Sequence, residues 1–561
     1  MARLPRYVAL ILATALVLGA CGAPPAETEP VITPGAVESP APGSPETPAE
    51  PAVLRVGWSG EPDILNPLTT YSSESGEVLQ LVYDQLLAFG LDLSPEPQLA
   101  SSYSYSEDGT TITFNLQENA TWHDGQPVTS ADVKYTFDLI HDNELGRFAA
   151  YLAHLVSVDA PDASTVVMTF DAPQALNPGL LIPILPMHIW SGMTAEEIEA
   201  FANDAPIGSG PYRFEAWERG ATVSLVRNED FWGDRPAPDE IIYVLYTNED
   251  VMVQALRVGD LDILTEVPPT MWDGLQDAEN VRVVSLPSFA FHYIGFNMYD
   301  SPDSLANPLV RERVIRQALN YAVDRNQLVE LALAGHGTPG DTLIAAGVTN
   351  WHLVIPPEEQ MNGDPERARQ LLDEAGYVDT DGDGVRESPD GAPLEFRLIA
   401  IATTTVDVRA AELFVAAAEA VGITLNLQTM DENTLGGIVY GLPNPDWDLE
   451  IWGWDMIPDP NQIMRAPLCS QIGNISDLMY CNPHYDELYA QQATTVDPVA
   501  RRAIIEEMQQ IIYDEGIYIV MWYQDKLQAY RTDTWQGWSE IPGGLIFNFT
   551  RGNYLAITPV P

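Results

Sequence analysis

Apolar and polar residues alternate with a period of two in some stretches of this chain and recur at helical spacing in others. Residues 110–116 show the alternation of a half-buried strand, and strands are also predicted at 54–58, 165–170, 212–217, 222–227, 240–246, 423–428, 449–452 and 518–522. Helices are predicted at 77–88, 130–140, 308–323, 365–375, 409–421 and 498–515. This mixture, which shows no internal repeat, predicts an α/β protein with at least two sheet-bearing units.

Residues with helix-ending chemistry support several of these predictions. Ser130 suits the start of one helix, and Gly422 suits the end of another. For the helix at 365–375, Asp364 fits the N-cap, Pro365 fits the first helical position and Gly376 fits the stop.

The first fifty residues have the pattern of an export signal followed by a linker. Arg3 and Arg6 precede an apolar run at 8–18, which is too short to span a bilayer, and small residues follow it. Residues 18–21 resemble the bacterial lipobox, which implies that Cys21 is lipidated and becomes the first residue of the mature chain. The alternative is an ordinary secretory signal with a chance cysteine. The chain thus predicts a signal peptide at 1–20 and, at 21–52, a lipidated cysteine with a Pro-rich, unfolded linker.

The charge of the chain limits its partners. With 81 acidic and 26 basic residues, the formal net charge is −55, and Lys134 and Lys526 are the two lysines. Binding to nucleic acid requires basic side chains for the phosphates, so we expect no nucleic-acid partner. A solvated acidic surface explains the charge, and solubility or saline surroundings could each favour it.

Two cysteines remain after Cys21. An even pair in an exported protein predicts a disulfide between Cys469 and Cys481. Two free, buried thiols are the alternative.

An acidic segment has the spacing of a calcium-binding EF-hand loop. Its ligands at positions 1, 3, 5, 7 and 12 would be Asp379, Asp381, Asp383, the Val385 carbonyl and Asp390, with Gly384 at position 6. The twelfth residue is Asp instead of the usual Glu, and Pro393 and a strand-like stretch replace the second EF helix. The hypothesis is a structural Ca²⁺ site, and the alternative is an acidic hairpin turn.

Motifs of catalysis are missing from the sequence. Residues 208–210 do not form a nucleophile elbow, the eight histidines include no zinc-protease pair, and no phosphate-binding loop is present. We therefore predict that the chain is not an enzyme and that any ATPase is a separate chain. A secreted hydrolase is the alternative from a different class.

Several blocks resemble one family when they are taken together and in order. The blocks are 60–67, 108–116, 119–133, 206–212, 311–325, 366–377 and 480–488. They resemble the family 5 extracellular solute-binding proteins of ABC importers, the oligopeptide-, dipeptide- and nickel-binding group, over residues 53–550. The resemblance implies a periplasmic-binding-protein-like clamshell of two lobes, with an additional α+β domain inserted in the first lobe.

The resemblance also implies domain boundaries. Lobe I would comprise 53–90, 206–290 and 524–561, the inserted domain 91–205, and lobe II 291–523. The chain would cross between the lobes near 291–297 and 520–524, and closure about such a hinge is known for periplasmic binders.

The implied function is that of a monomeric receptor anchored by lipid to the outside of the bacterial cell membrane. It would capture a peptide or similar small solute between its lobes and deliver it to an ABC permease, with no cofactor required beyond the calcium hypothesis. Nickel chelates, sugars and opines are other ligands of the family. A cell-surface solute sensor and a peptide chaperone are alternative functions.

The candidate ligand-binding residues are Tyr71, Ser72, Ser73, Trp122, Trp452, Trp454, Asp455 and Asp459. The turn after Trp452 combines indoles with acids, and in peptide-binding relatives an aspartate near this turn pairs with the peptide amine. Counted from the later Asp-Pro, however, the matching position is Met456, and residues 402–407 lack the arginine of dipeptide binders. Core packing is the alternative for the tryptophans.

Overall fold

The computed structural model describes residues 51–70, 72–402 and 404–561, and its largest element is a mixed sheet of eleven strands. The order along the sheet is β15-β14-β16-β12-β17-β11-β1-β10-β9-β8, and β13 also pairs with β17. The bounds are β1 (Val53–Trp58), β8 (Tyr212–Glu218), β9 (Thr222–Arg227), β10 (Glu240–Leu245), β11 (Ile263–Leu264), β12 (Val281–Phe296), β13 (Gly337–Pro339), β14 (Glu395–Ile401), β15 (Thr424–Met430), β16 (Leu449–Asp455) and β17 (Tyr518–Arg531).

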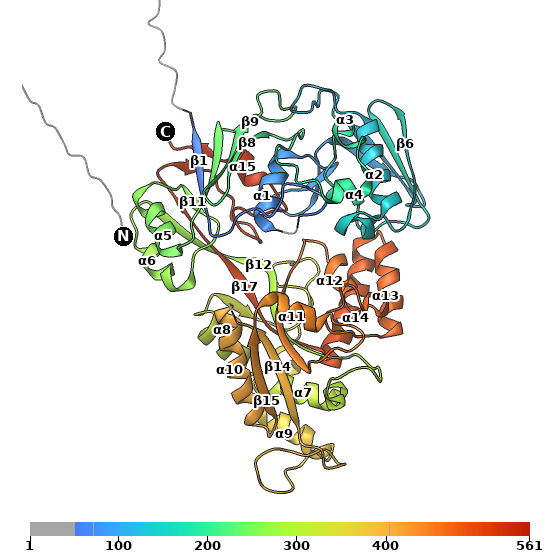
Figure 1. Cartoon of the computed structure of the whole chain (residues 1–561), viewed down its shortest axis with the longest axis vertical. Helices are drawn as coiled ribbons and strands as arrows, with labels where there is room; N and C mark the ends of the chain where they lie inside the picture. The colour runs from blue at the N-terminus through green and yellow to red at the C-terminus, as the bar shows by residue number, and fades with distance from the viewer. Residues whose placement is uncertain (1–50, 71, 403) are drawn as a thin grey trace, which may run out of the picture. The chain divides into compact units, whose positions relative to one another are not determined.

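Strands β12 and β17 are shared by two groups of strands (Figure 1). We call β1 and β8–β11, with the helices on them, the first lobe, and β14–β16 with their helices the second lobe. At one end β17 pairs with β11, through Ile263 and Tyr530, and at the other β12 pairs with β16, through Phe291 and Trp454. The register between β12 and β17 shifts between Pro287 and Phe291, so the ladder is irregular where the chain passes from one lobe to the other.

The first lobe carries helices α1 (Ser73–Val82), α5 (Glu249–Val258), α6 (Trp272–Gln276) and α15 (Gly552–Ala556). A buried ion pair joins distant parts of it, because Arg551 Nη2 lies 2.8 Å from the carboxylate of Asp84. The same carboxylate accepts hydrogen bonds from Ser209 Oγ and Trp232 Nε1. These contacts hold the C-terminal segment against the start of the lobe. Short strands β2 (Leu87–Phe89), β3 (Pro95–Pro97), β18 (Trp535–Gln536) and β19 (Thr558–Pro559) form two small sheets.

A separate antiparallel sheet has the order β4 (Ala100–Tyr105), β5 (Thr111–Leu116), β7 (Thr165–Phe170) and β6 (Leu155–Asp162). Buried and partly exposed residues alternate along β5 and β7, as the two-residue period predicts. Helix α2 (Ser130–Asn143) lies near this sheet in Figure 1 and begins with a capping box of Thr129 and Asp132. The shorter helices here are α3 (Met187–Trp190) and α4 (Ala195–Glu199). We call this sheet, its helices and the loops between them the small domain.

The second lobe packs helices α7 (Arg313–Ala322), α8 (Arg325–Ala332), α9 (Pro365–Glu374) and α10 (Thr405–Glu419) with strands β14–β16 around an apolar core. Helices α11 (Glu432–Val439), α12 (Asn461–Arg465), α13 (Pro483–Thr494) and α14 (Pro498–Glu515) complete it. The chain also forms 3₁₀ helices at Gly146–Leu152, Pro178–Leu180, Pro269–Met271, Pro308–Arg311, Pro357–Glu359 and Cys469–Gln471. Among the described residues, no helix combines the length and apolar content that crossing a membrane requires.

Some predicted element bounds differ from the structure. The helix predicted at 77–88 begins earlier, at Ser73, and ends at Val82, because Tyr83 is extended and Leu87–Phe89 pairs with β3 instead. The strand predicted at 518–522 continues to Arg531. Its later residues have a polar pattern, and pairing with β11 and β12 holds them extended, which is a tertiary effect that periodicity does not reveal.

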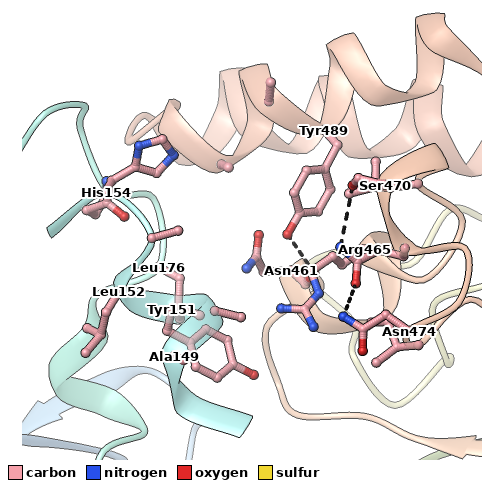
Figure 2. Close-up of a pocket in the computed structure, with 18 of the residues that line it drawn as sticks. Ala149, Tyr151, Leu152, His154, Leu176, Asn461, Arg465, Ser470, Asn474 and Tyr489 are labelled. Atoms are coloured by element: carbon pink, nitrogen blue, oxygen red, sulfur yellow. Dashed lines mark hydrogen bonds between the residues drawn. The ribbon is translucent and has the colours of Figure 1, made fainter. Parts of the chain in front are cut away.

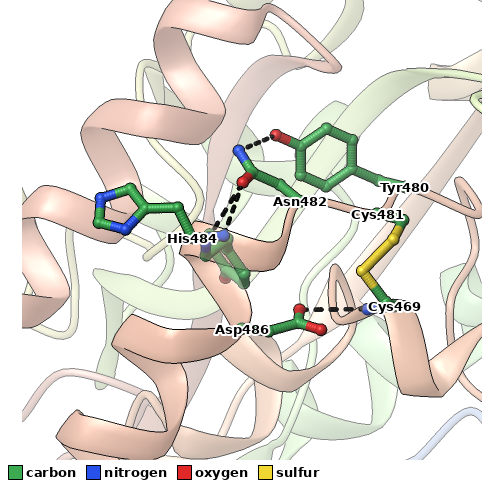
Figure 3. Close-up of a disulfide and its surroundings, with 7 residues drawn as sticks. Cys469, Tyr480, Cys481, Asn482, His484 and Asp486 are labelled. Carbon is green, nitrogen blue, oxygen red and sulfur yellow. Dashed lines mark hydrogen bonds between the residues drawn. A yellow bond between two sulfur atoms is a disulfide. The ribbon is translucent and has the colours of Figure 1, made fainter.

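The predicted disulfide is present, between Cys469 and Cys481 (Figure 3). It lies beside the start of α13, where the Cys469 backbone N–H donates to the carboxylate of Asp486 at 3.2 Å. Asn482 caps the same helix by accepting hydrogen bonds from His484 N and Tyr485 N. The bridge therefore fastens the chain that follows α12 to the residue that precedes the N-cap of α13.

We expect replacement of Cys469 and Cys481 together by serine to lower the free energy of unfolding by about 3 kcal/mol, because the bridge restricts a loop of 12 residues in the unfolded chain. Urea unfolding of the variant and of the oxidised wild type measures the difference. The reduced wild type is the control and should match the variant. Equal stability of oxidised and reduced wild type would contradict this account.

Candidate ligand-binding site

A cavity of about 370 Å³ lies where β12 and β17 pass between the lobes. The first lobe contributes Trp58, Ser59, Ser73, Glu74, Glu77, Thr265, Glu266, Val267 and Pro269. The shared strands contribute Ser288, Ala290, His292, Gln524, Asp525, Lys526 and Leu527, and the second lobe contributes Asp455. We call this space the crossing cavity. Its volume is within the usual range for sites that bind small molecules, about 300–1,000 Å³.

Carboxyl groups dominate the chemistry of the crossing cavity. Five carboxyl groups line it, from Glu74, Glu77, Glu266, Asp455 and Asp525, against one ammonium, from Lys526. The remaining ionisable side chain, His292, is already engaged, since its Nδ1 lies 2.8 Å from Oδ1 of the buried Asp407.

Helix α1 places Glu77 at the edge of this cavity. Ser72 caps the helix by accepting a hydrogen bond from the Ser75 N–H at 3.2 Å. Glu77 is 8% exposed and accepts a 2.9 Å hydrogen bond from Trp58 Nε1. Burial raises the pKa of Glu77 to about 7, although the nearby charge of Lys526 and the Trp58 bond oppose that shift.

A second cavity, of about 1050 Å³, lies between the small domain and the second lobe (Figure 2). Ala149, Tyr151, Leu152, His154 and Leu176 line one side of it, and Asn461, Arg465, Ser470, Asn474 and Tyr489 line the other. Tyr489 donates a hydrogen bond to the Asn461 carbonyl at 3.4 Å. This larger space has mixed polar and apolar walls and contains the cationic side chain of Arg465.

The structure brings two of the candidate ligand residues, Ser73 and Asp455, to the crossing cavity. Ser72 is the cap of α1, and its hydroxyl donates to Glu74 at 2.8 Å, so it orders a residue of the cavity wall. Tyr71 lies outside the described residues. Contact between these residues and a ligand stays a prediction.

Trp452 and Trp454 are partly buried and pack against the core of the second lobe. Trp454 Nε1 donates a 2.7 Å hydrogen bond to Asp477, and the Trp452 ring contacts that of Tyr440 with centroids 6.2 Å apart. Neither tryptophan lines either of the two cavities. Both tryptophans thus have contacts within the second lobe, and contact with a ligand stays a prediction.

Behind Trp454 lies a buried pair of acids that the sequence patterns did not reveal. Tyr293 OH lies 2.7 Å from Asp477 Oδ2 and 3.2 Å from Glu450 Oε1, and Tyr518 OH donates to Asp477 Oδ1 at 2.6 Å. Burial raises the pKa of Glu450 well above its usual value, and it also raises that of Asp477. Burial therefore favours the uncharged form of Glu450, and the pair fixes the strand that carries Trp454.

Asp459 and Trp122, two further candidates, line neither cavity. The Asp459 carboxylate receives two hydrogen bonds from the buried guanidinium of Arg501, at 2.7 and 2.9 Å, and accepts a third from the Asn461 N–H. Trp122 is 1% exposed and belongs to the apolar core that the small domain shares with the first lobe. Asp459 thus orders the turn before α12, while Trp122 packs the interior.

The acidic loop brings together a set of residues that differs from the EF-hand prediction. Carboxylates of Asp379, Asp381, Asp383 and Glu387 lie within 4.8 Å of one another, and Asp390 is not in this group. The Asp379 carboxylate accepts backbone hydrogen bonds from Gly382 and Gly384, as in a tight acidic turn. Calcium binding by this loop stays a prediction.

The sequence patterns missed most of the crossing cavity. Glu77, Glu266, His292 and Lys526 come from four separate segments, and none lies in a recognisable ligand motif. Two weak signals were available: Glu77 falls among the apolar positions of a predicted helix, and Lys526 is one of two lysines in the chain.

Comparison of sequences identifies relatives of this chain. The family model "Bacterial extracellular solute-binding proteins, family 5 Middle" matches residues 94–474. A Brucella ovis protein, provisionally named an ABC transporter peptide-binding protein, is 32% identical over 372 residues. This alignment covers 65% of the chain and 66% of the relative, slightly less than two thirds of that protein. The oligopeptide-binding protein AppA of Bacillus subtilis is 26% identical over 490 residues, 85% of this chain and 87% of AppA.

Comparison of structures identifies the same fold. The structure of Bacillus subtilis AppA in complex with a nonapeptide has a TM-score of 0.75 and 24% identity, and the match covers 91% of this chain and 100% of that one. NikZ from Campylobacter jejuni in complex with Ni(L-His) has a TM-score of 0.76 and 22% identity, with 90% and 99% coverage. These likenesses confirm the predicted fold class.

The buried carboxyl group of Glu77 predicts a specific dependence of stability on pH. The unfolded chain loses this proton near pH 4.5, whereas the folded protein keeps it to about pH 7. The contribution of Glu77 to the free energy of unfolding should therefore fall as the pH rises through this window, by up to about 3 kcal/mol, and stay low above it.

The isosteric variant Glu77→Gln should lack this fall, because the amide does not ionise and can still accept from Trp58. Urea unfolding at pH 5, 6, 7 and 8 measures the difference between variant and wild type, with the exposed Glu218→Gln as control. A difference that does not change between pH 5 and 8 would rule out this role of Glu77.

Proposed function

Because the chain belongs to the bacterial extracellular solute-binding proteins of family 5, we propose that it is the solute-binding component of an ABC importer. The family consists of non-catalytic binding proteins, in agreement with the prediction that the chain is not an enzyme. The observation that carries the proposal is the crossing cavity, which receives side chains from both lobes and from the two strands that join them.

The proposed mechanism follows from this position. A ligand in the crossing cavity touches both lobes at once, so it binds best to the arrangement in which the two walls fit around it. Binding then shifts the population toward that arrangement, by an amount set by the difference in affinity. The two strands are the connection about which the lobes would move, as in other hinge-closing binders.

The proposed ligand is a peptide or a solute of comparable size. Two observations on relatives support it: the Brucella ovis and Bacillus subtilis proteins are named for peptide binding, and the AppA structure holds a nonapeptide. NikZ holds Ni(L-His), so the fold also accepts a small metal complex.

We also propose that the chain acts outside the cell membrane and delivers its ligand to permease subunits served by a separate ATPase. Lipid at Cys21 would hold the protein at the membrane, and the linker up to residue 52 would let it reach the permease. Cys21 and residues up to 50 lie outside the described residues, so this part of the proposal depends on the sequence alone.

Ligand capture is tested by native mass spectrometry of the purified protein, followed by release and identification of the bound solute. Adding this solute back should raise the melting temperature and reduce the radius of gyration in X-ray scattering. Ser73→Trp, which fills the crossing cavity, should abolish both effects, while the exposed Ser191→Trp should keep them. A solute that stabilises the protein without any compaction would contradict the clamshell mechanism.

Lipid anchoring is tested with Cys21→Ser. We expect the wild type to sediment with membranes and its N-terminal peptide to carry the mass of acyl chains, whereas the variant should be recovered in the soluble exported fraction. The double variant Cys469→Ser/Cys481→Ser, which keeps Cys21, serves as the control and should stay with the membranes. An unmodified Cys21 in the wild type would disprove the anchor.

A further inference from the structure

The carboxyl groups of the crossing cavity come from four separate parts of the fold. Glu74 and Glu77 belong to α1, Glu266 follows β11, Asp455 ends β16 and Asp525 lies in β17. With all five carboxyl groups ionised, which for Glu77 requires a pH above about 7, their convergence gives the described cavity wall a formal charge of −4 when Lys526 is included and His292 is counted as neutral. Like charges that face one enclosed space repel one another, and a positive ligand in that space would relieve the repulsion.

The acidic surface of the whole protein does not by itself account for this wall. Surface carboxylates are solvated and cost little, whereas Glu77 is nine-tenths buried and its charge is opposed by desolvation. Within the described part of the chain, the one hydrogen bond to its carboxylate comes from Trp58, and no arginine, lysine or histidine forms an ion pair with it. Lys526 acts on this acid through its charge but forms no ion pair with it, so Glu77 has no direct ionic partner among the described residues.

Two other acids of the wall are also available to a ligand. Among the described residues, neither Glu266 nor Asp455 takes part in a side-chain hydrogen bond or ion pair, and both are exposed to the cavity. Two buried acids elsewhere differ from them, because Asp84 is paired with Arg551 and Asp459 with Arg501. The crossing cavity thus brings together acids that have no cationic partner among the described residues.

We propose that the crossing cavity takes an organic polycation, a solute with two or more ammonium or guanidinium groups. This inference rests on the proposed solute-binding function and specifies its ligand class. Basic peptides and linear polyamines share the required chemistry. They differ in one group, because a peptide has a carboxylate that Lys526 can pair with, and a polyamine has none.

Calorimetric titration of the full-length chain tests the charge requirement. The probes are trilysine and spermidine, with trialanine and triglutamate as neutral and acidic counterparts of trilysine. We expect one-to-one binding of at least one cationic probe, weakened by added salt, and at least about tenfold weaker binding of the neutral and acidic peptides.

Matched variants separate the cavity from the acidic surface. The double variant Asp455→Asn/Glu266→Gln should lower the affinity for the cationic probe by about tenfold or more, because it removes two carboxylates without internal partners. Asp303→Asn/Glu218→Gln changes the net charge by the same amount at exposed sites outside the cavity and should leave binding unchanged. Equal weakening by both pairs would overturn the proposal, since it would assign the binding to the surface as a whole.

The variant Lys526→Gln distinguishes a basic peptide from a polyamine. It should weaken the binding of trilysine, because the carboxylate of the peptide loses its partner. It should strengthen the binding of spermidine, because a repelling charge is removed. If the protein binds a neutral or acidic solute more tightly than the cationic probes, and Ser73→Trp blocks that binding, the polycation proposal is wrong. The proposed solute-binding function would still hold in that case. If no probe and no co-purified solute binds, the proposed function itself fails.

Discussion

The antiparallel pairing of β12 with β17 is the constraint on which the rest of this structure depends. These strands continue one sheet from the first lobe into the second, so each lobe completes its own sheet on a shared pair. The ladder is irregular between Pro287 and Phe291, where proline has no N–H to donate and where the Ser288 hydroxyl donates to the Gln524 carbonyl instead. The crossing cavity opens at this same place, so the irregular part of the shared ladder is also the part that a ligand would touch.

Buried acids in this protein fall into groups that have different physical roles. Asp84 and Asp459 are paired with arginines and fasten distant segments together. Glu450 and Asp477 are surrounded by tyrosine and tryptophan donors, and burial favours the uncharged form of Glu450. Glu77 belongs to neither group, because it is buried at the edge of a cavity with one indole as its partner. The partners of each acid thus distinguish structural carboxyl groups from those that face a ligand space.

How much of the candidate site could be predicted depends on how local its residues are. Ser73 and Asp455 were found because each adjoins a motif of the family, and both line the crossing cavity. Asp459 adjoins the same motif as Asp455, but Arg501 occupies its carboxylate, and a partner 42 residues away leaves no trace in the local pattern. Glu266 and Lys526 were missed for the same reason, since their importance comes from neighbours that are distant in the chain.

Local periodicity and capping residues were enough to predict most elements, because these depend on short-range patterns. The order of the motif blocks was enough to predict the family and the fold class. A simple count of cysteines was enough to predict the pairing of Cys469 with Cys481. The position of β12 in the sheet, the extension of β17 to Arg531 and the acidic wall of the crossing cavity arise in the folded molecule. Strand pairing and desolvation depend on residues that are hundreds of positions apart in the chain. The pKa of Glu77 is therefore raised by burial that exists in the folded molecule and leaves no mark in the local sequence.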